Sequence, residues 1–368
     1  MRTYKHLWEQ FVSRENYELA VRNATRRKGG NRRKRRRAAY WREHADKLRP
    51  RLICYAEHFA PTHHEPIEIY DGIRRKRRRI VVPTMEEQVV HHMLVNVLKP
   101  MFMRGMYEHS YGSIPDRGAH MAKSRMERWI RHGGRDCKYV LKMDVRKFFD
   151  SVPHDKLKAM LERKVRDERL MGVIEAVIDS APDVVGIPIG FYTSQWFANF
   201  YLTGLDHHIK ERLGAVRYMR YMDDMVVLGP NKRVLHRMRR EIARYLEDEL
   251  GLEMKGDWQV FRLDYVRRDG TRVGRALDFM GFRFFRDRTT LRRTLMLRLT
   301  RKARRIARKP RKTVHDARQM LSYMGWLSAT DTYGMYRIRV KPHVSFQQLR
   351  RKVGSYQRRM NEIERKAA

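Results

Sequence analysis

The stretch "RYMRYMDDMVVLG", residues 217–229, places two adjacent carboxylates inside an otherwise apolar segment. Valine and tyrosine side chains that alternate with other residues are typical of a half-buried strand. Asp223 and Asp224 repel each other there, and their burial costs desolvation energy unless a cation neutralises them. The two short flanking strands, "VRYMRY" and "MVVL", predict a hairpin with the paired acids at its tip.

A third acid, Asp144, ends the β-rich part of "KYVLKMDVRKFFDSVPHDKL". A neighbouring strand would bring Asp144 beside Asp223 and Asp224, and such carboxylates are the hard oxygen ligands that Mg²⁺ prefers. Two such ions about 4 Å apart stabilise the attacking and leaving oxygens of a phosphoryl transfer. The alternative is a plain turn, because Asp residues are common in turns.

The charge of the chain points to a polyanionic partner. The 368 residues carry 82 Lys and Arg against 42 Asp and Glu, a formal net charge of +40. Such an excess destabilises a compact protein through self-repulsion, so nucleic acid is the first candidate partner and an anionic membrane surface the second. No apolar run approaches the roughly 18 residues of a spanning helix, so no membrane-spanning segment is expected. Nucleic acid is the expected partner, and no membrane partner is expected. Two cysteines without metal-ligand spacing, and a first segment without an apolar signal core, predict a cytoplasmic protein.

The order of the expected elements predicts an α+β fold. Residues 1 to about 60 form a basic helical arm, and the run "RRKGGNRRKRRR" is flexible at its Gly-Gly pair and suited to phosphate. A helix from "MEEQVV" is expected to stop at Pro100. The order β–α–β–β–α–β then favours an α+β sheet domain with helical flanks. The tail, residues 286–368, holds 24 Lys and Arg against 5 Asp and Glu and is expected to be mostly helical.

These segments together resemble the bacterial reverse transcriptases. "YMDD" resembles the family's palm hairpin, and "KMDVRKFFDSVPH" the segment with its first catalytic aspartate. "KRRRIVVPTMEEQVVHHML" resembles the fingers, "HSYGSIPDRGAHMA" the next segment, "LGLEMKGDWQVF" the palm after the hairpin, and "LDFMGFRF" the primer grip. The resemblance covers about residues 70–290 in the family's order. It implies the right-hand polymerase fold, with fingers, a palm with an antiparallel sheet, and a helical thumb.

The resemblance also implies roles for single residues. Asp144, Asp223 and Asp224 would be catalytic and would hold two Mg²⁺ ions, with Mn²⁺ as a substitute and the Val145 carbonyl as a further ligand. Phe149 occupies the position of the steric gate, which excludes a ribose 2′-OH and so favours dNTPs. The residues expected to bind the nucleotide are Arg78, Arg79, Phe149, Ile189, Gly190 and Gln195. Only one of the two arginines can point inward, because side chains alternate along a strand. Lys255 is a candidate general acid for the pyrophosphate leaving group, although a solvated lysine is equally expected there.

The subfamily prediction depends on "IPIGFYTSQW". Ile-Gly and Ser-Gln stand where most reverse transcriptases have Gln-Gly and Ser-Pro, and this form resembles the enzymes of diversity-generating retroelements. The resemblance implies error-prone copying at template adenines, a small basic accessory protein and a structured non-coding RNA. The alternatives are a defence-associated or retron-type enzyme that makes a dedicated cDNA, and an inert RNA-binding scaffold. A group II intron maturase is less expected, since the chain leaves no room for its additional modules.

The resemblance divides the chain into four parts. They are a basic arm (1–60), fingers (61–140), a palm (141–285, with a fingers-contributing segment near 155–185) and a basic thumb (286–368). The expected partners are an RNA template, an RNA/DNA duplex and dNTPs.

Overall fold

The computed structural model describes residues 2–26, 32–60, 62, 65–71, 76–181 and 183–366. The chain divides into two units, one of Met1–Gly118 with Leu141–Val260 and one of Ala119–Val140 with Phe261–Ala368. The Gly-Gly pair of the basic arm lies outside the described residues. The division into arm, fingers, palm and thumb stays a prediction.

A four-stranded sheet carries the paired acids. Its strand order is β4 (Arg217–Tyr221), β5 (Asp224–Gly229), β3 (Tyr139–Asp144) and β6 (Gln259–Arg262). β4 and β5 form the antiparallel hairpin that the sequence predicts, with Tyr221 opposite Asp224. Along the chain, helices separate β3 from β4 and one helix separates β5 from β6, so the predicted β–α–β–β–α–β order is confirmed.

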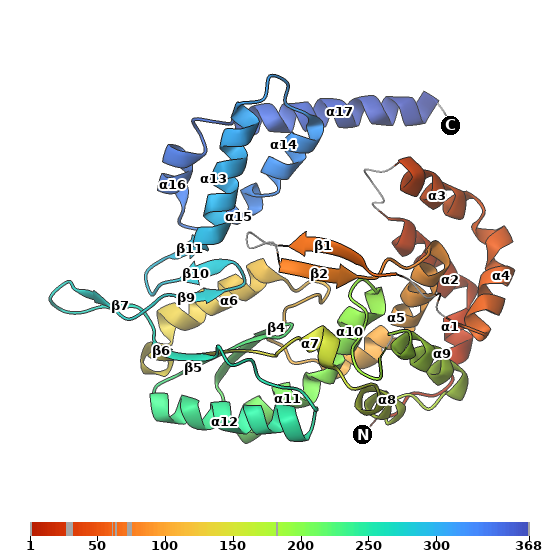
Figure 1. Ribbon diagram of the computed structural model, residues 1–368, viewed down its shortest axis with the longest axis horizontal. Coiled ribbons are helices and arrows are strands. Elements are labelled where there is room, and N and C mark those ends of the chain that lie inside the picture. Colours follow the sequence, from red (N-terminus) through yellow and green to blue (C-terminus); the bar gives the residue numbers. More distant parts are fainter. Residues whose placement is uncertain are drawn as a thin grey trace. The chain divides into compact units, whose positions relative to one another are not determined.

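Helix α12 (Lys232–Asp248) lies along this sheet and packs against β5 (Figure 1). It begins at Asn231, whose side chain accepts a hydrogen bond from the backbone N–H of Arg233. Its buried residues are Leu235, Ile242 and Leu246, which share one helix face. The other elements between β3 and β4 are α7 (Phe148–Ser151), α8 (His154–Glu162), α9 (Glu168–Asp179), α10 (Tyr192–Tyr201), α11 (Thr203–His207) and the π-helical turn η2 (His208–Arg212).

Helices and one β-hairpin account for most of the described residues up to Gly118. α2 packs against α5, which also packs against α10. The elements are α1 (Leu7–Val12), α2 (Arg14–Thr25), α3 (Arg32–Glu43), α4 (Ala45–Glu57), β1 (Ile67–Asp71), β2 (Lys76–Ile80) and α5 (Met85–Gly105). The predicted helical character of the arm is thus confirmed over its described residues.

The expected stop of α5 at Pro100 is wrong. The helix starts where Thr84 and Glu87 form a capping box, and it continues through Pro100 to Gly105. Pro100 removes one backbone hydrogen bond. The neighbouring side chains of Met101 and Phe102 are buried, and their packing offsets that loss.

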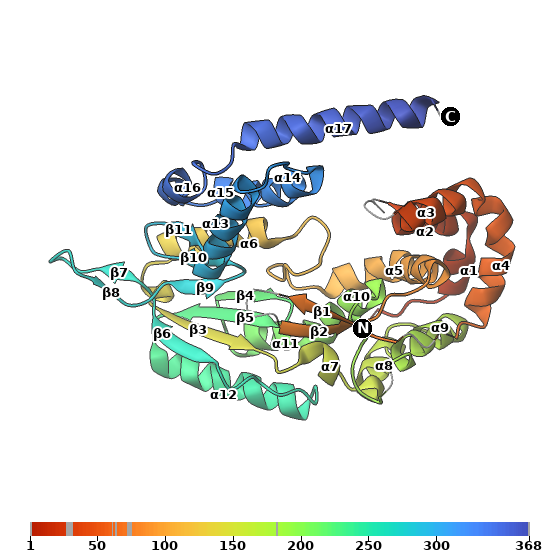
Figure 2. The same ribbon diagram turned by 45° about the horizontal axis from the view of Figure 1, so that its top comes forward.

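The second unit combines small sheets with basic helices (Figure 2). Its elements are α6 (Ala119–His132), the 3₁₀ turn η1 (Gly134–Cys137), β7 (Tyr265–Val266), β8 (Arg272–Val273), β9 (Leu277–Phe279), β10 (Phe282–Phe284), β11 (Thr289–Leu291), α13 (Arg293–Ala307), α14 (Val314–Leu321), α15 (Met324–Ser328), α16 (Tyr333–Arg339) and α17 (Phe346–Lys366). Phe282 of the β9–β10 hairpin packs on Trp326, with ring centroids 4.9 Å apart. The predicted helical tail is confirmed, and none of the helices within the described ranges is long and apolar enough to span a membrane.

Candidate active site

Asp144 and Asp223 lie together at one end of the sheet. Asp144 is the last residue of β3, and Asp223 is the second residue of the two-residue loop between β4 and β5. The backbone N–H of Val145 donates to the Asp223 carbonyl at 3.3 Å, which joins the end of β3 to the loop. On the other side, the backbone N–H of Lys255 donates to the Asp144 carbonyl at 2.8 Å. The backbone therefore holds both carboxylates close together from three segments.

Repulsion and burial dominate the electrostatics of this pair. Burial raises the pKa of Asp144 to about 6, and the charge of Asp223 adds to the increase, while Lys255 and Lys142 oppose it. Burial also raises the pKa of Asp223, and the charge of Asp224 acts in the same direction. Negative charge is thus present in excess of what the neighbouring cations neutralise, and a divalent cation would relieve it.

Asp224 does not form a three-carboxylate metal-binding group with Asp144 and Asp223. It begins β5, and its Oδ1 atom is 3.8 Å from Nζ of Lys142 on β3. Within the described part of the chain, no three His, Cys, Asp or Glu side chains converge as a metal-binding group. The hard oxygens of Asp144 and Asp223 nevertheless fit a cation such as Mg²⁺, since the donor set and the excess charge agree. The metal roles of Asp144, Val145, Asp223 and Asp224 stay predictions.

The β1–β2 hairpin distinguishes between the two candidate arginines. Arg78 is half-buried, whereas Arg77 and Arg79 on either side are exposed, as alternation along a strand requires. The charge of Arg78 lowers the pKa of Asp223 against the effect of burial, so Arg78 faces the carboxylates. Arg77 instead pairs with Glu68 on β1.

The loop before α10, which contains Ile189 and Gly190, joins α7, which carries Phe149, to the end of the strand that carries Arg78. The N–H of Ile187 donates to the Phe149 carbonyl at 2.7 Å, and the N–H of Val81 donates to the Ile189 carbonyl at 2.8 Å. Gly190 has φ +125°, and a Cβ atom there would lie 2.0 Å from the Val81 carbonyl oxygen. Only glycine allows this approach, so the Ile-Gly pair is held against the end of β2.

Of Gln195 and Lys255, only Lys255 has a described contact with the carboxylates. The Gln195 side chain is exposed on α10, and no described contact joins it to the carboxylates. Nζ of Lys255 is 2.5 Å from Oδ2 of Asp257 and 3.6 Å from Oδ2 of Asp144. The hydrogen bond with Asp257 raises the pKa of Lys255, which therefore remains a protonated donor beside Asp144.

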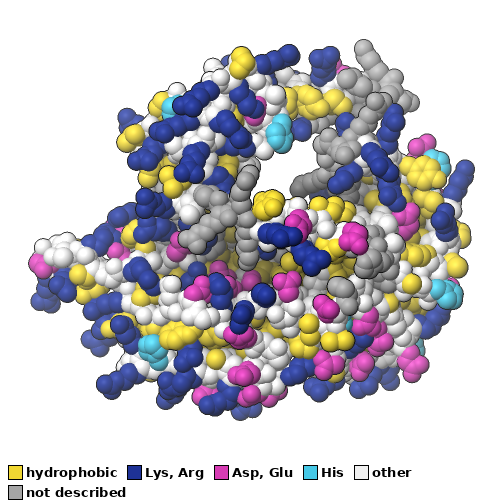
Figure 3. Space-filling view, viewed as in Figure 1, with side chains coloured by type: hydrophobic (Ala, Val, Ile, Leu, Met, Phe, Trp, Pro, Cys, Tyr) yellow, Lys and Arg dark blue, Asp and Glu magenta, His cyan; other side chains and the backbone are white. Residues whose placement is uncertain are grey.

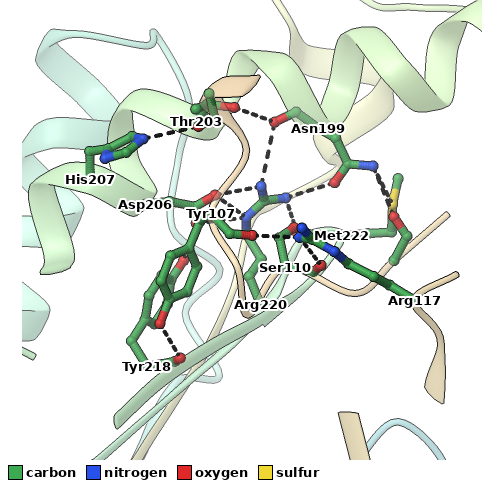
Figure 4. A network of polar contacts seen from close by, with 12 residues as sticks. Tyr107, Ser110, Arg117, Asn199, Thr203, Asp206, His207, Tyr218, Arg220 and Met222 are labelled. Carbon is green, nitrogen blue, oxygen red and sulfur yellow. Dashed lines mark hydrogen bonds and ion pairs between the residues drawn. The ribbon is translucent and has the colours of Figure 1, made fainter. Parts of the chain in front are cut away.

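Sequence reasoning missed the buried polar network beneath the hairpin (Figure 4). Arg220 in β4 is fully buried and pairs with Asp206 of α11, with 2.6 Å between Nη2 and Oδ2. The same guanidinium donates to Oδ1 of Asn199 on α10 at 3.0 Å. An arginine in the middle of an apolar strand was the available signal, because such a charge needs a buried partner.

The arrangement places the carboxylate at the end of β3 beside the one in the β4–β5 loop, with an arginine and two lysines near them. Residues 70–270, more than half of the chain, match the model of the family described as reverse transcriptase (RNA-dependent DNA polymerase). The chain therefore belongs to the reverse transcriptase family, whose enzyme class is the RNA-directed DNA polymerases. The predicted polymerase fold, a mixture of helices and antiparallel sheet, is confirmed.

Similar proteins include intron-encoded ones. The chain is 30% identical over 142 residues to an "uncharacterized 91 kDa protein in cob intron" of Schizosaccharomyces pombe, which is 36% of this chain and 17% of that protein. It is 23% identical over 255 residues to protein YkfC of Escherichia coli, 58% of this chain and 65% of that protein. A solved telomerase from Candida albicans, in complex with a fragment of telomeric RNA, matches 83% of this chain and 60% of its own with a TM-score of 0.45 and 13% identity. The chain thus spans less than two thirds of each of these proteins.

Proposed function

We propose that the protein is an RNA-directed DNA polymerase that copies an RNA template into cDNA. The observation that carries this proposal is the Asp144–Asp223 pair, held together at the sheet end with raised pKa values and with Arg78 facing it. Clustered, partly buried carboxylates with raised pKa values destabilise the fold, so their presence fits a role in binding cations.

The residues around the pair would have distinct tasks. Asp144, Asp223, Asp224 and the Val145 carbonyl would hold two Mg²⁺ ions, which neutralise developing charge on the attacking and leaving oxygens. Arg78 would bind the triphosphate of the incoming dNTP, since a guanidinium fork matches phosphate geometry. Lys255, protonated beside Asp144, would donate a proton to the pyrophosphate.

Nucleotide selection would depend on Phe149 of α7 and on the loop that joins α7 to the end of β2. The Phe149 ring is half-buried, and its backbone is anchored by Ile187, so the side chain cannot easily withdraw from a ribose. A bulky ring at that place would exclude the 2′-OH of a ribonucleotide and favour dNTPs. Ile189 contributes no hydrogen bond from its side chain and would constrain the nascent base pair less than a polar residue.

The positive charge of the chain supports RNA and RNA/DNA duplex as the macromolecular partners. Lys and Arg side chains are spread over the face drawn in Figure 3. Residues 33–36, at the beginning of α3, are all basic and exposed. Each phosphate that they neutralise releases counterions, so binding would weaken steeply with salt and depend little on base sequence. A cytoplasmic location belongs to the same proposal.

The finer proposal is a diversity-generating retroelement enzyme, error-prone at template adenines, with a small basic accessory protein and a structured non-coding RNA. It is supported by the Ile189–Gly190 pair, where a missing contact worth ~1–3 kcal/mol would change base discrimination roughly 10- to 100-fold. The second candidate is an intron-type reverse transcriptase, because the S. pombe relative and a nuclear intron maturase of Arabidopsis thaliana are intron proteins by name. A defence-associated or retron-type enzyme and an inert RNA-binding scaffold remain as further alternatives.

One experiment separates these candidates. The purified protein is incubated with Mg²⁺, dNTPs and a primed RNA template containing all four bases, and the cDNA is sequenced, with Asp223→Ala as the blank. Errors concentrated opposite adenine, reduced in Ile189→Gln, are expected of the retroelement enzyme. Accurate cDNA favours the intron-type or retron-type candidate. If neither an accessory protein nor the cognate RNA restores synthesis to an inactive preparation, the polymerase proposal is refuted in favour of the scaffold.

A further inference from the structure

A buried ion pair between Arg220 and Asp206 lies beneath the β4–β5 hairpin, and several further hydrogen bonds join it to its surroundings. Arg220 Nε donates to both carboxylate oxygens of Asp206, at 2.8 and 3.0 Å, and Nη2 donates to Oδ2 at 2.6 Å. The hydroxyl of Tyr218 donates to Oδ1 of Asp206 at 2.7 Å. Burial raises the pKa of Tyr218, which keeps this hydroxyl protonated as a donor. Asp206 therefore neutralises the charge of Arg220. The hydrogen bonds that Arg220 makes to the loop are additional to this ion pair.

Nη1 of Arg220 points to the loop that carries Asp223. Nη1 donates to the carbonyl of Met222 at 3.1 Å and to Oδ1 of Asn199 at 3.0 Å. Met222 has φ +56°, an unfavourable backbone conformation for a methionine. The hydrogen bond from Arg220 therefore holds the residue before Asp223 in a conformation that it would not choose alone.

Asn199 connects the same loop to helix α10. Its Nδ2 atom donates to the carbonyls of Gly112 at 2.9 Å and Gln195 at 3.1 Å, and contacts Sδ of Met222 at 3.5 Å. A Cβ atom at Gly112 would lie 2.5 Å from Cγ of Met222, so the loop is packed closely on this side as well.

A third segment fixes the backbone of Arg220 itself. Its N–H donates to the His109 carbonyl at 3.1 Å, and its carbonyl accepts from the N–H of Tyr111 at 3.0 Å. Arg117 donates to the carbonyls of Tyr107 and Ser110 in that segment, at 2.8 and 3.3 Å. Arg220, three positions before Asp223, is thus restrained through both its backbone and its side chain.

We propose that Arg220 is a positioning residue of the active site, which uses its pairing with Asp206 and Asn199 to fix the Met222–Asp223 loop so that the Asp223 carboxylate stays beside Asp144. The alternative is that the network only stabilises the fold. The inference rests on the proposed function of Asp223 and deepens it. Arg220 does not touch substrate in this role but acts through the Met222 carbonyl.

The test separates positioning from stability with two variants of Arg220. Arg220→Lys keeps the charge beside Asp206 but has one ammonium group in place of the planar fork, so it cannot also reach Met222 and Asn199. The triple variant Tyr218→Phe, Asp206→Leu, Arg220→Met removes the buried ion pair together with the Tyr218 hydroxyl, and such apolar replacements are often neutral for stability. Tyr201→Phe is the matched control, because it removes a buried hydrogen bond to the Leu250 carbonyl in the same unit, away from the loop.

Binding of Mn²⁺ to the protein is followed by electron paramagnetic resonance, beside melting temperature, primer–template affinity and kcat. We expect both Arg220 variants to weaken Mn²⁺ binding roughly 10-fold and to lower kcat roughly 100-fold, with primer–template affinity unchanged. Tyr201→Phe should change only the melting temperature.

The other outcomes of the Arg220 experiment also decide whether Arg220 has a positioning role. Folded Arg220 variants that bind Mn²⁺ and turn over like the unaltered protein would overturn the positioning role. If neither variant folds, Asn199→Ala, which removes only a neutral amide, must show the same loss of Mn²⁺ affinity for the proposal to stand. If the unaltered protein binds Mn²⁺ but makes no cDNA, the proposed function fails while the Mn²⁺ comparison still judges the positioning role.

Discussion

The partial burial of the acid pair predicts that Asp144 destabilises the protein in the absence of metal. Its folded pKa of about 6 lies above the ordinary value of 3.8, because burial and Asp223 disfavour the charged form. The folded state thus binds more protons than the unfolded state between these values, so the free energy of unfolding falls as the pH rises through that range. Asp144→Asn removes the charge while keeping the shape, and should make the metal-free protein more stable at pH 8.

The magnitude follows from the same values. The difference of about 2 pH units corresponds to roughly 3 kcal/mol at ~1.4 kcal/mol per unit. The Asp144 side chain is 32% exposed, and solvent screening reduces the expected gain to roughly 1–2 kcal/mol. For a chain of this size that is a rise of roughly 1–3 °C in melting temperature.

The assay is thermal unfolding in EDTA at pH 8 and pH 4.5, repeated with Mg²⁺ at pH 8. The gain of Asp144→Asn should shrink as the pH is lowered, because Asp144 itself then becomes neutral. Mg²⁺ should stabilise the unaltered protein and not the variant, which reverses their order. Asp183→Asn, at an exposed loop carboxylate, is the control. Equal melting temperatures of Asp144→Asn and the unaltered protein in EDTA at pH 8, or a gain that persists in full at pH 4.5, would refute the reasoning.

Other substitutions test the nucleotide side of the site. Gly190→Ala should destabilise the protein by roughly 2 kcal/mol or more in a denaturant titration, since its Cβ would collide with the Val81 carbonyl at a positive φ; unchanged stability would mean that the loop is not held there. Arg78→Ala should raise the KM for dNTPs roughly 10- to 100-fold and Arg79→Ala less than about 2-fold in steady-state synthesis, and equal effects would contradict the inward orientation of Arg78 alone. Phe149→Ala should reduce discrimination against ribonucleotides at least ~10-fold in a competition assay, and an unchanged ratio would remove the steric-gate role.

The local pattern of the chain was sufficient to predict much of the fold. Alternating apolar residues on both sides of Met222 and Asp223 predicted the β4–β5 hairpin, because a two-residue loop and a period of two leave little choice of pairing. The end of α5 was mispredicted for the opposite reason. Local rules place a stop at Pro100, but burial of the neighbouring side chains, which depends on the rest of the fold, outweighs one missing hydrogen bond.

Residue types and their order along the chain were enough to assign the class of protein and to predict Asp144, Asp223 and Asp224 as its catalytic acids. Tertiary structure alone decided which neighbours act on those acids. It placed Arg78 and not Arg79 toward Asp223, left the Gln195 side chain exposed, and brought Asp206 and Asn199 beneath Arg220. These relations join residues up to about 145 positions apart, as between Arg78 and Asp223, and only the packed core defines the distances and burial that give such pairs their energies.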